Sequence, residues 1–195
     1  MSRPEENPRN YLEELLRERG MRAEDYVRID DRRVGEQTFQ ATATVTLPDG
    51  EEVSASGEVT HGAKWTRLQA CQALLDQLRA SHSHLFEPWS NIQADARAGD
   101  SLIKLAVYLE QGGATSAEVS QLLQSLESNA RLAEIYDSWK RLNAPELRDW
   151  GTHLSEHRKG SLVEAIIWRR LGASILSDGA REGLRSLIQI LVAST

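Results

Sequence analysis

Two neighbouring segments between residues 39 and 59 alternate apolar and polar side chains, and this alternation is the strongest constraint on the fold. The apolar positions are Phe39, Ala41, Ala43, Val45 and Leu47 in the first segment, and Val53, Ala55, Gly57 and Val59 in the second. A period of two is typical of a β-strand that buries one face and exposes the other. The string Pro48-Asp49-Gly50 between them has the residues of a tight turn. The sequence therefore predicts a β-hairpin.

Apolar residues at helical spacing flank this hairpin on both sides. Before it, Pro8 suits a first helical turn and Gly20 suits a helix end, and an apolar stripe lies between them. A further strand is predicted at residues 25–29, followed by a charged turn at residues 30–35. After Gly62, one side of a predicted helix carries Trp65, Leu68, Cys71, Leu75 and Leu78. Residues 1–80 thus predict an α+β domain of order α-β-β-β-α.

The remainder of the chain shows only helical periodicity. Apolar stripes occur at Leu102, Leu105, Ala106 and Leu109, at Val119, Leu122, Leu123 and Leu126, and at Leu184, Leu187, Ile188 and Leu191. Residues 93–195 therefore predict an all-α domain of about five helices, and the polar residues 81–92 predict a linker. Asp100 follows Gly99 at the expected start of the first of these helices, where its carboxylate would stabilise the helix dipole.

Composition narrows the classes of function. The net charge is -6, with 11 basic and 15 acidic residues in positions 1–80 and 12 and 14 in the remainder. Because neither half is basic, any nucleic-acid binding must come from a local patch. The single Cys71 cannot form an intramolecular disulfide, and neither a signal peptide nor an apolar run of about 18 residues occurs. We expect a soluble, cytoplasmic protein that makes no membrane contact.

The α-β-β-β-α segment resembles a double-stranded RNA-binding domain. The resemblance lies in the strings Pro8-x-x-Tyr11-Leu12-x-Glu14-Leu15, Thr38-Phe39, Pro48-Asp49-Gly50 and Ala70-Cys71-x-Ala73-Leu74. Such domains recognise duplex RNA by shape, through a first-helix face and a loop in successive minor grooves and a basic helix start on the phosphates between them. The resemblance implies that Glu14 binds ribose hydroxyls and that Lys64 and Arg67 contact phosphates.

The segment departs from that family at two of its contact points. The first inter-strand loop of the family usually reads Gly-Pro-x-His, whereas Arg32-Arg33-Val34-Gly35 lies here, and the usual lysine pair of the last helix is reduced to Lys64. Each missing phosphate contact lowers affinity. Lys64 and Arg67 are alternatively a solvated helix face. Trp65 and Trp168 are candidate interface anchors, with core packing as the competing interpretation.

The helical half resembles the catalytic domain of ribonuclease III. The matching strings are Gly99-Asp100-Ser101-Leu102-Ile103-x-Leu105, Ser128-Asn129-Ala130-Arg131-Leu132-Ala133 and Glu164-Ala165-Ile166-Ile167. In that family, carboxylates at a helical dimer interface hold Mg²⁺, and metal-bound water attacks the phosphodiester. The resemblance implies that Asp100, Glu118 and Glu164 are catalytic acids, that Asp100 and Glu164 bind Mg²⁺, and that the chain forms a homodimer through this domain.

The carboxylate set that this resemblance implies is incomplete. The positions of two upstream glutamates hold Gln93 and Ala96, and the aspartate expected before Glu164 is replaced by Ser161. Asp95 is one residue from an expected position, but one residue turns a helical side chain through about 100 degrees.

Two further comparisons with the family point in opposite directions. The string at residues 157–165 is closer to the Mini-III branch, which also lacks an aspartate at the Ser161 position. A shifted alignment instead puts Arg169, and no acid, at the glutamate position.

Three functions follow from these patterns. The first is a protein that binds double-stranded or structured RNA and whose ribonuclease III-like domain is non-catalytic or weak. The second is an active, Mg²⁺-dependent endoribonuclease that cleaves double-stranded RNA. The third is a protein-interaction or dimerisation module, which the acidic balance favours.

Overall fold

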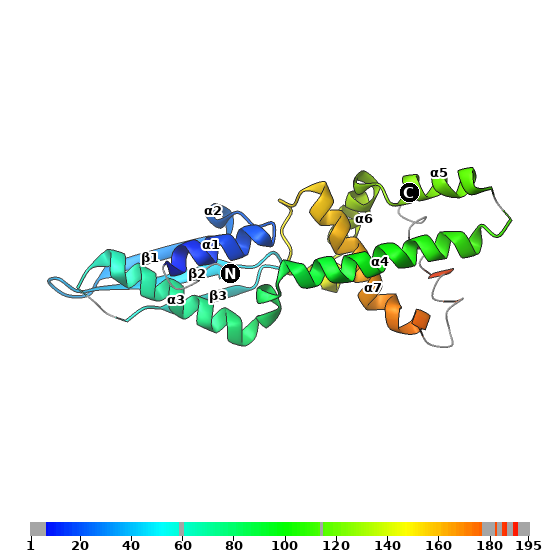
Figure 1. The fold of residues 1–195 in the computed structure, drawn as a ribbon. Helices are drawn as coiled ribbons and strands as arrows, with labels where there is room; N and C mark the ends of the chain where they lie inside the picture. Colours follow the sequence, from blue (N-terminus) through cyan, green and yellow to red (C-terminus); the bar gives the residue numbers. More distant parts are fainter. Residues whose placement is uncertain are drawn as a thin grey trace. The chain divides into compact units, whose positions relative to one another are not determined.

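The computed structural model describes residues 7–58, 61–113 and 115–176, together with the single positions 182, 185, 186, 189 and 190 (Figure 1). This part of the chain is mostly helical and contains one three-stranded antiparallel sheet. The chain divides into two compact units, Met1–Glu87 with Arg148–His153, and Pro88–Leu147 with Leu154–Thr195. The first unit extends to Glu87 and so includes the first residues of the predicted linker 81–92, and residues 148–153 also belong to this unit.

The first unit has the α-β-β-β-α order that the sequence predicts. Its elements are α1 (Pro8–Glu18), the one-turn helix α2 (Ala23–Tyr26), β1 (Val27–Arg33), β2 (Phe39–Thr46), β3 (Glu52–Ser56) and α3 (Ala63–Ser81), followed by a 3-10 turn, η1 (Ser83–Phe86). The sheet has the order β1-β2-β3, with Val27 opposite Val45 and Thr42 opposite Ser56. The strand expected at residues 25–29 begins later, because α2 occupies residues 23–26, and it continues through the expected charged turn to Arg33.

The alternation in β2 separates a buried face from a hydroxyl-bearing one, as predicted. Ala41, Ala43 and Val45 are buried. On the other face, the hydroxyls of Thr42 and Ser56 lie 2.8 Å apart. Helix α3 packs against β2 and β3, and α1 packs against α3 (Figure 1). The largest buried side chains of the resulting core are Leu12, Leu16, Met21, Leu47, Leu74, Leu75, Leu78 and Leu85.

Helix α3 turns one of its expected core side chains to solvent. Cys71, Leu75 and Leu78 are buried as predicted, but Trp65 is 61% exposed. At this turn the buried position belongs to Thr66, whose hydroxyl donates a hydrogen bond to the carbonyl of Gly62. The prediction that Trp65 packs in the core is therefore wrong.

The second unit is all helical in its described residues. Its elements are α4 (Trp89–Glu110), α5 (Ser116–Leu126), α6 (Asn129–Arg141), the 3-10 turn η2 (Pro145–Leu147) and α7 (Glu156–Leu176). Helix α7 packs against both α4 and α6 (Figure 1). The final predicted stripe, from Leu184 to Leu191, lies outside the described residues. Across the part of the chain that is described, no helix has both the length and the apolar character needed to cross a membrane.

Helix α4 starts at Trp89, well before the start near Gly99 that the sequence suggested. Asp100 therefore lies in the middle of the helix, where the dipole effect of the first turn has faded, and its predicted capping role is wrong. The buried face is also rotated. Ile103 and Val107 are buried beside Leu102 and Ala106, whereas Leu105 and Leu109 are 45% and 60% exposed, because α4 buries the face that packs against α7.

The backbones of α4 and α7 touch at Gly99. A Cβ atom added to this glycine would lie 2.0 Å from the carbonyl oxygen of Glu164 and 2.6 Å from its carbonyl carbon. Both neighbours are backbone atoms, so neither can rotate away as a side chain would. The absence of a side chain at Gly99 therefore sets how closely the two helices approach.

Gly99→Ala is expected to destabilise the protein by about 2–3 kcal/mol, because the added methyl group overpacks the crossing. In the middle of a helix this substitution ordinarily stabilises by up to about 1 kcal/mol, so the sign of the effect is informative. Urea unfolding followed by circular dichroism measures the difference. The matched control is Gly112→Ala, where the added atom meets only the Leu109 oxygen at 3.9 Å. Equal stability of Gly99→Ala and wild type would contradict the close crossing.

Candidate functional site

Three carboxylates of the second unit influence one another, and we call Asp100, Glu127 and Glu164 the acid group. Asp100 comes from the middle of α4, Glu127 from the end of α5, and Glu164 from α7. The contact of Gly99 with the Glu164 backbone brings the Asp100 and Glu164 regions together. The structure thus places two of the predicted catalytic acids near each other.

The Glu164 carboxyl is held partly protonated at neutral pH. Its pKa is raised from 4.5 to about 7, first by burial and then by the negative charges of Asp100 and Glu127, while Lys104 opposes the change. Both causes disfavour the ionised form. A half-buried carboxyl with a pKa near neutrality can accept or release a proton at physiological pH, which is the behaviour required of a general acid or base.

Glu127 is the member of the acid group that the sequence did not reveal. Its pKa is raised by burial and by Asp100, and Lys104 partly offsets this. Its Oε1 atom is buried and meets no hydrogen-bond donor among the described residues. Glu127 lies in the turn between two helices, so helical periodicity carries no signal for it. Only its position directly before the Ser128–Ala133 string could have drawn attention to it.

Lys104 neutralises part of the acid group from one turn along α4. Its Nζ lies 2.7 Å from Oδ2 of Asp100, in the i,i+4 geometry of neighbouring side chains on a helix. The Asp100 hydrogen bond is the main reason that the pKa of Lys104 is raised, and Glu127 and Glu164 add to it. The ammonium group therefore occupies one carboxylate oxygen of Asp100.

The third predicted catalytic acid, Glu118, has a structural role at the other end of α5. Its side chain accepts hydrogen bonds from the backbone N–H and hydroxyl of Thr115, while the Thr115 hydroxyl accepts from the Glu118 N–H, forming a capping box. These bonds lower the pKa of the Glu118 carboxyl. Most of α5, about 13 Å along its axis, separates it from Glu127. The structure does not join Glu118 to the acid group.

The positions where the family resemblance expects further acids contribute none. Gln93 is exposed on α4, and Ala96 and Ser161 are buried. Asp95, the neighbouring acid, is engaged by Arg169 of α7, whose Nε lies 2.7 Å from its Oδ2. This ion pair occupies the acid that was closest in sequence to an expected position.

The described residues do not fit a Mg²⁺ site. Among them, no group of three or more histidine, cysteine, aspartate or glutamate side chains converges as metal ligands. Carboxylate oxygens are suitable donors for Mg²⁺. However, Lys104 occupies Asp100, and a Glu164 carboxyl with a pKa of about 7 is only partly ionised at neutral pH, which weakens it as a ligand.

In the first unit, the predicted ribose-binding residue Glu14 lies exposed on α1. Its Oε1 is 3.7 Å from Nη2 of Arg17, one turn further along the helix. An open groove of about 760 Å³ lies beside this face, and Glu14, Arg17 and Asn10 line it. The Glu14 carboxylate therefore stands where a molecule lying along α1 would meet it.

The two predicted phosphate-binding residues differ in their surroundings. Lys64 is exposed in the first turn of α3. Arg67, one turn later, donates from Nη2 to both carboxylate oxygens of Asp31 on β1, at 2.8 and 3.0 Å. The positive charge of Arg67 is therefore largely balanced within the protein. Asp31 on β1 supplies the balancing charge, and no sequence pattern pairs it with Arg67.

The predicted RNA contacts of the first unit lie on one continuous surface. A second groove, of about 350 Å³, is lined by Lys64 and Arg67 together with Asn10 and Glu13 of α1. Asn10 and Glu13 also line the larger groove beside Glu14. The two grooves therefore share a wall of α1, and we call their combined lining the α1 surface.

Comparisons of this chain with family models, with curated proteins and with solved structures found no match. The functional interpretation therefore rests on the arrangement of the chain's own residues.

Glu164→Gln is expected to make the protein more stable at pH 8 and to leave its stability unchanged near pH 4. The folded-state pKa of Glu164 is raised, so its favourable contribution is complete below pH 4.5 and is lost as the pH rises through about 7. After allowance for partial exposure, the gain at pH 8 is on the order of 1 kcal/mol. Urea unfolding across this pH range measures it.

Glu118→Gln is expected to change the stability of the protein at pH 8 in the opposite direction. Hydrogen bonding lowers the pKa of Glu118, so its stabilising contribution is present above its ordinary pKa and is lost as the pH falls. This variant is expected to lose stability at pH 8 and to approach wild type in acid. If the free energy of unfolding of both variants, relative to wild type, changed with pH in the same direction, the environments described for the two carboxyls would be contradicted.

Proposed function

We propose that this chain binds double-stranded or structured RNA through its first unit, and that its ribonuclease III-like second unit cleaves RNA weakly or not at all. The observation that carries the proposal is the continuous α1 surface, which joins Lys64 and Arg67 to Glu14 through a shared wall. A surface of this kind can follow an RNA helix from phosphates to the sugar hydroxyls of a minor groove.

The charge of the first unit favours recognition by shape over broad electrostatic attraction. Residues 1–80 carry 11 basic and 15 acidic side chains, so few phosphates can be neutralised at once. The Arg67–Asp31 ion pair reduces that number further. We therefore infer modest affinity for duplex RNA and a shallow dependence on salt concentration.

The state of the acid group supports the weak or absent cleavage. Phosphodiester hydrolysis of the kind found in the resembling family needs several ionised carboxylates around hard metal ions. Here Asp100 is engaged by Lys104, Glu164 is only partly ionised at neutral pH, and Glu118 belongs to a capping box outside the acid group. The acid group therefore lacks the several free, ionised carboxylates that this chemistry needs.

One observation favours the second candidate, an active endoribonuclease. The Gly99 crossing brings Asp100 and Glu164 together, and these are the two acids that the family resemblance assigns to metal binding. A duplex RNA that enters with its own counterions could displace Lys104 from Asp100. Cleavage is therefore tested alongside binding.

A homodimer through the second unit is the association that we propose. Leu105, Tyr108 and Leu109 on α4 are 45%, 59% and 60% exposed and lie at positions i, i+3 and i+4, on one side of the helix. Contiguous exposed apolar side chains of this kind are typical of protein interfaces. The resembling family pairs its nuclease domains through helices, which supports a second copy as the partner.

The deciding experiment incubates the protein with a labelled RNA duplex of about 30 base pairs, long enough for a domain that spans about 16. Native gels report binding, and denaturing gels report cleavage, each with Mg²⁺ and with chelator. We expect a shifted, uncut duplex. Lys64→Ala is expected to weaken binding several-fold through loss of one phosphate contact, whereas the matched control Arg28→Ala, an exposed cation paired with Asp30, changes little.

The other outcomes separate the remaining candidates. Cuts that require Mg²⁺ and disappear in Asp100→Asn would establish the endoribonuclease. No shift at low salt would contradict RNA binding and would favour the protein-interaction module.

Asp31→Asn is expected to increase duplex affinity about threefold, because it releases the Arg67 charge for a phosphate. The slope of log affinity against log salt is expected to steepen by about one, the value of one phosphate contact. Fluorescence anisotropy titrations at several salt concentrations measure both effects. The matched control is Asp30→Asn, which removes the same charge from β1 but faces the other side of the sheet and pairs with Arg28. Equal effects of the two variants would mean that net charge matters and Arg67 does not.

A further inference from the structure

Residues 148–153 come from the connection between η2 and α7, yet they form part of the first unit. Two backbone hydrogen bonds hold them there. The N–H of Gly151 donates to the Arg19 carbonyl at 2.8 Å, and the N–H of His153 donates to the Gly20 carbonyl at 2.9 Å. The segment thus runs directly beside the end of α1.

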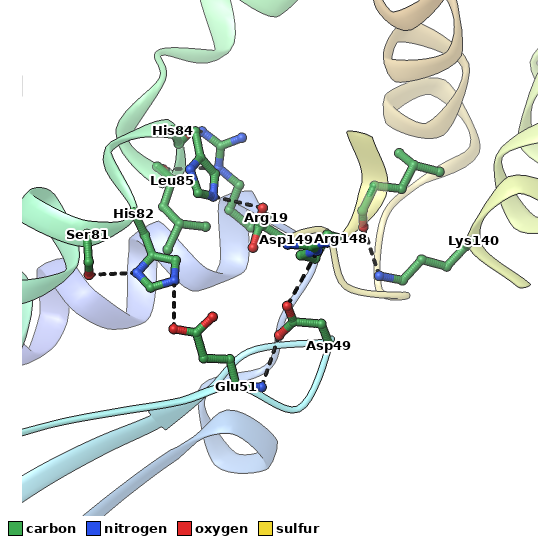
Figure 2. Close-up of polar contacts among 11 residues, drawn as sticks. Arg19, Asp49, Glu51, Ser81, His82, His84, Leu85, Lys140, Arg148 and Asp149 are labelled. Carbon is green, nitrogen blue, oxygen red and sulfur yellow. Dashed lines mark hydrogen bonds and ion pairs between the residues drawn. The ribbon is translucent and has the colours of Figure 1, made fainter. Parts of the chain in front are cut away.

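Side chains reinforce this attachment on both sides of the segment. Nε2 of His84 lies 2.8 Å from Oδ2 of Asp149, and Nε of Arg148 lies 3.7 Å from Oδ2 of Asp49 (Figure 2). The Trp150 ring is buried under the guanidinium of Arg19, 4.4 Å from its centre. These contacts define a single position for the segment.

Gly151 permits this approach because it has no side chain. A Cβ atom there would lie 2.1 Å from the Gly20 oxygen and 2.5 Å from the Gly20 carbonyl carbon. Any other residue would push the segment away from α1. This close contact also holds the backbone of His153, which lies two residues further along.

The exposed His153 side chain lines the larger groove, opposite the α1 residues Asn10, Glu14 and Arg17. A residue remote in sequence therefore contributes to the α1 surface that contains the predicted ribose-binding glutamate. Arg22 also lines this groove.

The chemistry of this groove suits neutral hydroxyl groups better than phosphates. Glu13, Glu14 and Glu24 supply acceptors, and Arg17, Arg22 and His153 supply donors, so the groove offers both kinds of hydrogen-bond partner. A run of phosphates would be repelled by the three carboxylates. The ribose 2′-hydroxyl both donates and accepts hydrogen bonds, so it can use either kind of partner.

We propose that His153 is a further RNA-binding residue, which the segment 148–153 supplies to the α1 surface and which hydrogen-bonds ribose 2′-hydroxyls in the minor groove. This inference rests on the proposed RNA-binding function. It adds a contact that residues 1–87 do not contain, so the RNA-binding surface is complete only when the second half of the chain is present.

The test measures the affinity of the full chain for the duplex of about 30 base pairs by fluorescence anisotropy, for wild type and His153→Ala. Loss of one hydrogen bond is expected to weaken binding about three- to tenfold. The slope of log affinity against log salt is expected to stay unchanged, because no phosphate contact is lost. The matched control is Thr152→Ala, an exposed residue of the same segment that does not line the groove.

A duplex with 2′-O-methyl groups identifies the atom that is recognised. We expect His153→Ala to cost less than twofold on this duplex, because the methyl group blocks the approach of the imidazole to the 2′ oxygen and the hydrogen bond is already lost. Circular dichroism unfolding of each variant confirms that the fold is retained.

Three outcomes would overturn the assignment in distinguishable ways. Unchanged affinity of His153→Ala, with normal binding by wild type, would remove His153 from the surface. A loss accompanied by a salt slope lower by about one would mean that His153 contacts a phosphate. Absence of duplex binding by wild type at low salt would overturn the proposed function and, with it, this inference.

Discussion

The burial of the Arg19 guanidinium is the interaction on which the first unit depends. A buried cation destabilises a fold unless hydrogen bonds replace its hydration. Arg19 is 5% exposed, and it donates to the carbonyls of Leu85, His84 and Glu87 at 3.1, 3.0 and 2.8 Å. Its open face is covered by the Trp150 ring. One side chain therefore joins the end of α1 to the η1 turn and to the segment 148–153.

Each unit also relies on a glycine to bring distant parts of the backbone into contact. Gly151 meets the carbonyl of Gly20, and Gly99 meets the carbonyl of Glu164. In both cases a polar residue follows within two positions, the groove-lining His153 after Gly151 and Asp100 of the acid group after Gly99. The missing side chain thus fixes the backbone from which each of these polar side chains extends.

Local compensation of charge is common to both sites. Asp31 balances Arg67 on the α1 surface, and Lys104 balances Asp100 in the acid group. Such pairs stabilise the folded protein little when they are partly exposed. Their main consequence is electrostatic, because each reduces the charge that these residues present to solvent. A duplex that binds here must be recognised mainly through its shape and its hydroxyl groups.

The sequence by itself determined the secondary structure wherever one face of an element is continuously buried. The alternation in β2 and the helix between Pro8 and Gly20 both follow from local periodicity and cap chemistry. The α+β organisation of the first unit and the helical character of the second follow as well. Local patterns suffice here because the spacing of residues within one element determines which side chains lie on the same face.

Only the tertiary structure decided which side of α4 is buried, which carboxyl groups lie close enough to shift one another's pKa, and where residues 148–153 lie. The stripe at Leu105 and Leu109 was equally consistent with burial, and packing against α7 selected the neighbouring face. Glu127 and His153 lie in irregular segments, so no periodicity marks them. The positions of His153 and of the Asp100–Glu164 pair arise from backbone contacts between residues far apart in the chain. Those contacts depend on the absence of a methyl group at two glycines, and a sequence does not reveal which partner a glycine will approach.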